Sequence, residues 1–126
     1  IAFSELRAQV PLNDRTFVVI VTRSHQHDEE VLVQLLDMPL AYLGVIGSRT
    51  KVARLFRRLR EAGHPPEQID RVHAPIGLDI GAETPAEIAV SIVAELIQTR
   101  RGGTGLPLSQ LARQGSPAAR HGPCPA

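Results

Sequence analysis

The chain has 126 residues, with 14 basic and 13 acidic side chains, and 43% of its residues are hydrophobic. A net charge of +1 gives no overall preference for nucleic acid or for a membrane surface, so neither is expected as a partner. The sequence shows no signal peptide and no apolar run of the roughly 20 residues that span a bilayer. Its single cysteine, Cys124, can form no internal disulfide. We therefore expect a cytoplasmic protein.

Two apolar, β-branched runs predict the first strands. Phe17 to Val21 and Tyr42 to Ile46 are typical of strands that are covered on both faces of a parallel sheet. Between them, leucines and valines at helical spacing follow the acidic segment Asp28 to Glu30, and Pro39 comes after the last of them. We therefore expect a short helix there, which completes a right-handed βαβ unit.

A second helix is predicted after Gly47 and Ser48. Apolar residues at helical spacing run from Val52 to Leu59, the opposite face is strongly basic, and Gly63 marks the end. Arg71 to Ala74 could add a third short strand. Strands that alternate with helices predict an α/β fold with a doubly wound sheet.

The last helix has the clearest start. Thr84 is suited to be its N-cap, Pro85 its first residue and Glu87 the residue that closes a capping box. The helix should run to about Arg101. Its polar residues form one narrow stripe, so we expect burial on several sides, against the sheet and either a second copy of the chain or a missing domain. These polar residues are Glu87, Ser91, Glu95 and Gln98.

The remainder of the chain is rich in glycine and proline. We therefore expect residues 104–126 to form a disordered tail, which leaves residues 1–103 as the folded part.

Three segments could carry function, and the first runs from Thr22 to Asp28. It follows a predicted strand at the carboxyl edge of the sheet, where open α/β sheets bind ligands. His25, His27 and Asp28 are similar to the zinc-binding motif of metallo-β-lactamases, although Glu29 stands where that pattern has a histidine. In the alternative interpretation, Asp28 caps the helix and both histidines are polar loop residues.

The second segment, Gly44 to Lys51, is a turn from strand to helix. A hydroxyl N-cap at Ser48 and the early cations Arg49 and Lys51 surround the free N–H groups of the helix start, which favours a phosphate. The segment has neither a Walker A loop nor the dinucleotide pattern Gly-x-Gly-x-x-Gly. A capped turn with solvated cations explains it nearly as well.

The third segment is the loop that precedes the last helix. Gly77 gives its backbone freedom, and Asp79 and Glu83 are acceptors suited to an amide-rich heterocycle. Alternatively, Asp79 only satisfies amides of the loop, as Glu87 is used by the capping box.

These three segments, Thr22 to Asp28, Tyr42 to Arg49 and Ala74 to Glu95, resemble the C-terminal domain of the XdhC/CoxI family, in order and at similar spacing. The family comprises accessory factors of xanthine dehydrogenase and carbon monoxide dehydrogenase. The similarity extends from about Asn13 to Gly103. It implies a partial Rossmann-like parallel sheet flanked by helices.

The resemblance also implies a function. Family members bind the molybdenum cofactor, a molybdopterin that carries a phosphate, and assist its sulfuration and insertion into a molybdenum hydroxylase. They act as chaperones and not as catalysts, so we expect no catalytic residue and no metal ligand. The partners implied by the resemblance are the apo-enzyme of the hydroxylase and a cysteine desulfurase. Separately, we expect a homo-oligomer, because the apolar faces of the helices need cover. The implied cofactor-binding residues are His25, Asp28, Gly44, Gly47, Ser48, Arg49, Gly77, Asp79 and Glu83.

One departure from the family keeps alternatives open. Family members begin this domain with a Gly-x-Gly strand and helix, after a separate domain that contains a cysteine, whereas this chain begins at Ile1 without either. We therefore expect a fragment, or a chain that pairs with another. The alternatives are an NAD(P)-binding oxidoreductase domain, a metal-dependent hydrolase that uses His25, His27 and Asp28, and an inactive truncated product.

Overall fold

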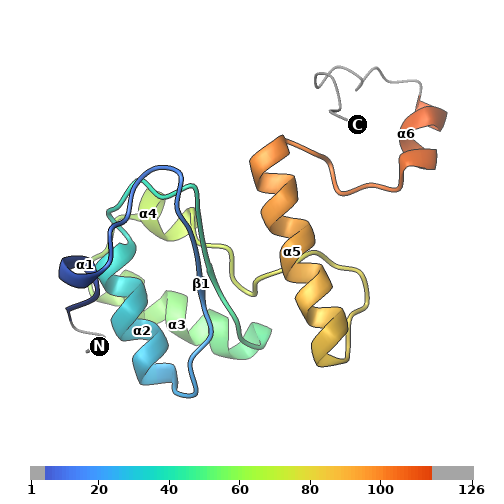
Figure 1. The fold of residues 1–126 in the computed structure, drawn as a ribbon. Coiled ribbons are helices and arrows are strands. Elements are labelled where there is room, and N and C mark those ends of the chain that lie inside the picture. The colour runs from blue at the N-terminus through green and yellow to red at the C-terminus, as the bar shows by residue number, and fades with distance from the viewer. Residues whose placement is uncertain (1–4, 115–126) are drawn as a thin grey trace. The chain divides into compact units, whose positions relative to one another are not determined.

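The computed structural model describes residues 5–114 of the chain (Figure 1). The chain divides into two compact units, Ile1–Gly77 and Leu78–Ala126. The elements of the first are α1 (Leu6–Gln9), β1 (Phe17–Ile20), α2 (His25–Leu35), β2 (Tyr42–Val45), α3 (Arg49–Glu61) and α4 (Pro66–Asp70). Those of the second are α5 (Pro85–Arg101) and α6 (Leu108–Gln114).

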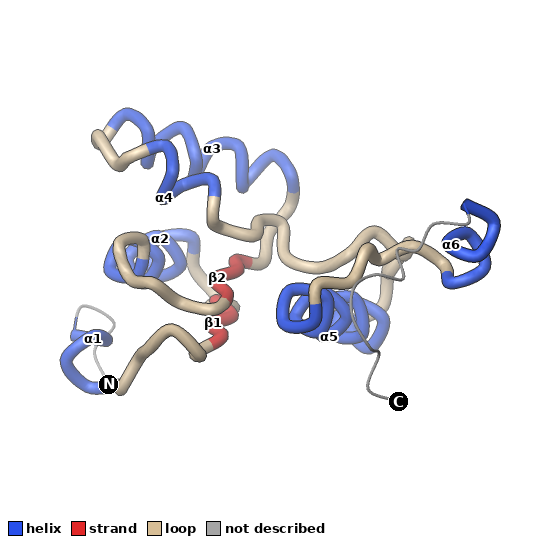
Figure 2. The backbone as a smooth tube through the Cα atoms, turned by 90° about the horizontal axis from the view of Figure 1, so that it is seen from above, coloured by secondary structure: helices blue, strands red, loops and turns tan. Residues whose placement is uncertain are grey.

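The first unit contains the predicted βαβ unit. β1 and β2 pair in parallel, with Phe17 opposite Tyr42 and Ile20 opposite Val45, and α2 connects them. Figure 2 shows the two strands side by side. Each strand ends one residue earlier than predicted. The α/β fold expected from the sequence is confirmed as a small, partial Rossmann-like arrangement.

The predicted third strand is reduced to one residue. His73 forms a parallel bridge with Gly44: its N–H donates to the Leu43 carbonyl at 2.9 Å, and its carbonyl accepts from the Val45 N–H at 3.0 Å. The next donor of a parallel ladder would be residue 75, and Pro75 has no N–H. Ile76 donates to the Val45 carbonyl instead, at 3.1 Å. The prediction of a strand from Arg71 to Ala74 was therefore wrong.

The core of the first unit comes from the predicted apolar faces. Leu32 and Leu35 of α2 and Leu59 of α3 are almost fully buried, with Ile20 and Val45 from the strands. These contacts fix both helices against the sheet, and thereby fix where their N-termini lie.

The start of α2 differs from the prediction. Ser24 is its N-cap, and its Oγ accepts a hydrogen bond from the Gln26 N–H at 3.1 Å. Asp28 is therefore not the cap, and His25 and His27 belong to the first turn and not to a loop. Serine is as good an N-cap as aspartate, and an acidic side chain in the first turn is favoured by the helix dipole.

Gly44 has a packing role. The Tyr42 ring stacks on His73, with ring centroids 4.5 Å apart, and on Phe17 at 6.0 Å. Residues 42 and 44 share one face of β2, so this ring lies beside Gly44. A Cβ atom at Gly44 would lie 2.7 Å from the Tyr42 ring and 2.9 Å from Ile76 Cδ1. Only glycine fits here without movement of its neighbours.

In the second unit, the bounds of α5 agree with the prediction. The Thr84 side chain accepts from the Glu87 N–H at 3.2 Å, and the Glu87 carboxylate accepts from the Thr84 N–H at 3.0 Å. Gly102 ends the helix in the left-handed conformation, with φ of 77°, which is the usual role of a C-terminal glycine.

The polar stripe of α5 was predicted wrongly at one position. Ser91, assigned to this stripe, is the only buried residue of the helix among those described. Val90, Val93 and Ile97 are more than half exposed in the single chain, and their expected cover by a second copy of the chain or a missing domain stays a prediction. The Ser91 hydroxyl donates to the Leu78 carbonyl at 2.6 Å, so its burial leaves no polar group unpaired.

A second correction concerns the predicted tail, because α6 lies inside it. The Gln110 N–H donates to the Pro107 carbonyl at 2.9 Å at the start of this helix. The prediction used the average composition of the 23 residues from 104 to 126, and such an average does not reveal a helix of 7 residues. The remaining prediction of disorder, including Cys124, falls outside the described residues. None of the helices within residues 5–114 has both the length and the apolar character of a bilayer span.

Candidate functional site

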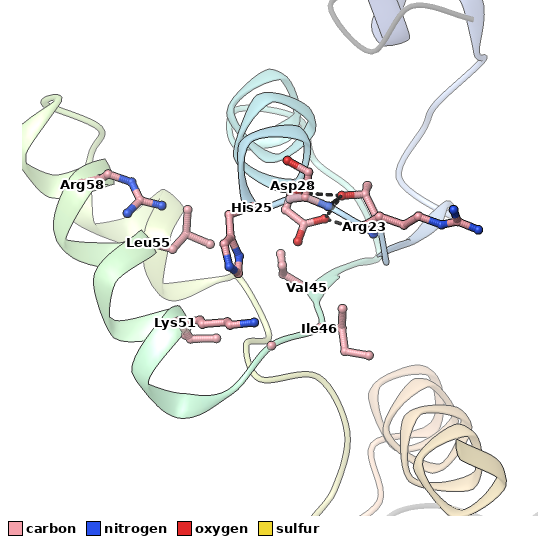
Figure 3. A pocket seen from close by; sticks show the side chains of 12 residues that line it. Arg23, His25, Asp28, Val45, Ile46, Lys51, Leu55 and Arg58 are labelled. Atoms are coloured by element: carbon pink, nitrogen blue, oxygen red, sulfur yellow. Dashed lines mark hydrogen bonds between the residues drawn. The ribbon is translucent and has the colours of Figure 1, made fainter. Parts of the chain in front are cut away.

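A pocket of about 310 Å³ lies where β1 and β2 end (Figure 3). Because the strands are parallel, both junctions from strand to helix meet at this edge of the sheet, which is the ligand-binding edge of open α/β folds. The lining comes from four segments of the first unit. They are Thr22, Arg23 and Ser24 after β1; His25 and Asp28 of α2; Val45, Ile46 and Gly47 around the end of β2; and Lys51, Val52, Leu55 and Arg58 of α3.

Two helices begin at this pocket. Ser24 caps α2, and Ser48 caps α3 by accepting from the Lys51 N–H at 3.2 Å. The first N–H groups of a helix have no partner within the helix, and the helix dipole makes this end positive. Two such ends beside one pocket favour an anionic group.

Positive charge also predominates among the charged side chains that line the pocket. Arg23, Lys51 and Arg58 are cations, and Asp28 is the one carboxylate. In Figure 3, Lys51 of α3 and His25 of α2 extend into the same space from opposite walls, whereas Arg23 points away from them. Lys51 is therefore the cation best placed for a ligand in this space, and Arg58 lines the pocket farther along α3.

Asp28 is a buried carboxylate, only 9% exposed. Its Oδ1 accepts two hydrogen bonds from Thr22, from the hydroxyl at 2.6 Å and from the backbone N–H at 3.1 Å. Within the described residues its Oδ2 makes no hydrogen bond, and Figure 3 shows the carboxylate directed into the pocket. The pocket thus provides one fixed acceptor beside its cations.

An ion pair spans the two helices at this pocket. Arg58 Nε of α3 donates to both carboxylate oxygens of Glu29 of α2, at 3.3 and 3.2 Å. The side chains are 47% and 31% exposed, so the pair contributes little to stability.

The predicted cofactor-binding residues are distributed unevenly. His25, Asp28 and Gly47 line the pocket. Ser48 caps the neighbouring helix, and Arg49 is exposed without lining the pocket. Gly44 serves the packing of Tyr42. Gly77, Asp79 and Glu83 are not among the lining residues, and the last two belong to the second unit.

Sequence reasoning did not single out Arg58 as a site residue. The signal was present in the sequence, because residues 51, 55 and 58 recur at helical spacing and therefore lie on one face of α3. The sequence marks Arg58 only as part of the strongly basic face of this helix, and the position of α2 was needed to place it at the pocket.

The zinc-site alternative finds no support in this geometry. His25 and His27 are two residues apart in a helix, so their side chains do not face the same side. Asp28 Oδ1 is engaged by Thr22. In residues 5–114 no three His, Cys, Asp or Glu side chains lie together as metal ligands would.

Residues 2–96 match the family described as the XdhC Rossmann domain. The chain is 47% identical over 89 residues to the uncharacterized protein YqeB of Escherichia coli strain K12, covering 71% of this chain and 16% of that protein. It is 43% identical over 83 residues to a probable xanthine dehydrogenase subunit from Bacillus subtilis strain 168, covering 66% and 23%.

Among solved structures, a xanthine dehydrogenase from Bacillus halodurans matches with a TM-score of 0.67 and 36% identity, over 88% of this chain and 32% of that one. The chain therefore spans between about a sixth and a third of the length of these relatives.

Proposed function

Because the chain belongs to the XdhC Rossmann-domain family, we propose that the protein is a chaperone-like accessory factor in the maturation of a molybdenum hydroxylase. Similarity to the probable xanthine dehydrogenase subunit from Bacillus subtilis supports this role. The cargo would be the molybdenum cofactor. A cysteine desulfurase would supply its sulfur, and the apo-hydroxylase would receive it.

The observation that carries the proposal is the pocket between the first turns of α2 and α3. The cofactor has a phosphate at one end and a pterin ring with N–H groups at the other. Lys51 and the N-terminus of α3 supply positive charge for the phosphate. Asp28 Oδ2 supplies an acceptor for N–H donors of the ring, since a carboxylate is an acceptor only.

The pocket also suits a bound cargo in size and lining. Small-molecule sites are usually about 300–1,000 Å³, with apolar walls and a few polar groups that fix orientation. The walls here include Val45, Val52 and Leu55, all buried. These side chains can hold and orient a ligand and partly exclude water from it.

The test is binding by the purified full-length protein. Molybdenum cofactor released from a molybdenum enzyme is added without oxygen, and the molybdenum that co-elutes with the protein is measured. We expect retention by the native protein. Lys51→Ala should weaken it about tenfold or more, because a hydrogen bond to a charged group contributes about 1.5–3 kcal/mol.

A matched control separates the pocket from overall charge. Arg57 is exposed on the same helix and does not line the pocket, so Arg57→Ala removes one positive charge outside the site. It should leave retention nearly unchanged. A parallel titration with NAD(P) addresses the oxidoreductase alternative. Retention of NAD(P) without any retention of molybdenum cofactor would overturn the proposal.

A further inference from the structure

We propose that Glu29 is a positioning residue of the pocket, which holds Arg58 by its Nε so that the terminal nitrogens of the guanidinium are left for an anionic group of the ligand. This inference rests on the proposed function, because it requires that the pocket binds an anion. It assigns a role to a carboxylate that does not itself line the pocket.

The hydrogen-bond pattern is the first argument. An arginine and a carboxylate often pair through two parallel N–H···O bonds, which would use a terminal nitrogen. Here a single donor, Arg58 Nε, contacts both Glu29 oxygens, at 3.3 and 3.2 Å. Within the described residues the two terminal nitrogens of Arg58 make no hydrogen bond. Four of the five guanidinium N–H donors remain for a ligand.

The position of the pair is the second argument. Arg58 lines the pocket from α3, and Glu29 lies one residue after the pocket residue Asp28 in α2. An exposed arginine loses rotamer freedom when it binds a ligand, at a cost of about 0.5–1.5 kcal/mol. A carboxylate that already restrains this side chain lowers that cost.

Two other interpretations make the opposite prediction. Glu29 could compete with the ligand for Arg58, or it could act only as a negative charge near an anion site. In both cases, removal of its charge strengthens anion binding. If Glu29 positions Arg58, removal of the Glu29 charge weakens anion binding. Whether the affinity for the anion rises or falls therefore distinguishes the positioning role from the other two interpretations.

The experiment uses the full-length protein and inorganic phosphate as probe, with affinity measured by calorimetry at low ionic strength. Glu29→Gln should weaken phosphate binding by a factor of about two to five, in line with exposed ion pairs of up to about 1 kcal/mol. In an Arg58→Gln background, the same substitution should no longer weaken binding. Glu29→Asp, which keeps the charge on a shorter side chain, should restore part of the affinity.

Glu30→Gln is the matched control, because it removes the same charge from the next, exposed position of α2. It should leave binding unchanged or strengthen it slightly. If Glu29→Gln behaves like this control, the positioning role is overturned while the proposed function stands.

If the native protein binds neither phosphate nor molybdenum cofactor, the proposed function fails and this inference with it.

Arg58→Lys provides a second test if the Glu29→Gln variant does not fold. It keeps the charge but loses the guanidinium fork, so it should weaken binding as well, and unchanged binding would contradict the proposal.

Discussion

Ser91 and Leu78 exchange two hydrogen bonds in the second unit. The Ser91 hydroxyl donates to the Leu78 carbonyl at 2.6 Å, and the Leu78 N–H donates to the Ser91 carbonyl at 3.2 Å. The loop before α5 is thereby attached to the second turn of the helix. Ser91 is 6% exposed, so its hydroxyl satisfies a carbonyl where little water is available.

The substitution Ser91→Ala should lower the free energy of unfolding by about 1–2 kcal/mol, because it leaves the Leu78 carbonyl without this donor. Urea denaturation of the native and substituted proteins measures the difference. Thr99→Ala is the control, since it removes a hydroxyl from an exposed position of the same helix. An equally small effect of both substitutions would show that the Ser91 hydroxyl has no structural role.

The case of Ser91 shows where periodicity fails. The spacing of polar residues predicted an exposed stripe on α5, but a polar residue can be buried when a partner is present, and the partner lies 13 residues away in a loop. By contrast, the start and end of α5 were predictable, because Thr84, Glu87 and Gly102 act through contacts within a few residues. Local signals fixed the bounds, and only tertiary contacts fixed the buried face.

The same distinction applies to the candidate site. The position of the pocket could be predicted from the order of strands and helices, since the segments Thr22 to Asp28 and Gly44 to Lys51 lie where parallel strands end. The identity of the cation that lines the pocket could not be predicted. Arg49 and Lys51 are both early residues of α3, and the packing of α3 against the core places Lys51 at the pocket and Arg49 outside it.

Gly44→Ala should destabilise the first unit. The added methyl group would lie 2.7 Å from the Tyr42 ring, and this ring is held between Phe17 and His73. Overpacking of this kind typically costs about 1–3 kcal/mol. We expect a lower midpoint in urea denaturation.

Gly103→Ala is the control for this substitution, because an added Cβ at Gly103 meets no atom within 4 Å. Its effect should stay within about 0.5 kcal/mol. If the two alanine variants were equally stable, the Tyr42 ring would shift at no cost to make room for the added methyl group. The packing role of Gly44 would then be wrong.

Glu87 should make the stability of α5 depend on pH. Hydrogen bonds from the backbone N–H groups of Thr84 and Glu83 lower the pKa of the Glu87 carboxyl in the folded protein. A carboxylate with a lowered folded pKa stabilises the fold fully above its unfolded pKa, about 4.3 for glutamate. The contribution is lost as the pH falls through the folded pKa, since protonation weakens both hydrogen bonds.

The variant Glu87→Gln isolates this charge, because glutamine also fits a capping box but does not titrate. We expect the native protein to be more stable than the variant at pH 7, and the difference to shrink as the pH falls from about 5 toward 3. Glu83→Gln serves as the control, since the Glu83 side chain makes no hydrogen bond within the described residues. Denaturation by urea across this pH range measures both differences, and a gap between native protein and Glu87→Gln that stays constant with pH would show that the carboxylate charge does not stabilise the helix start.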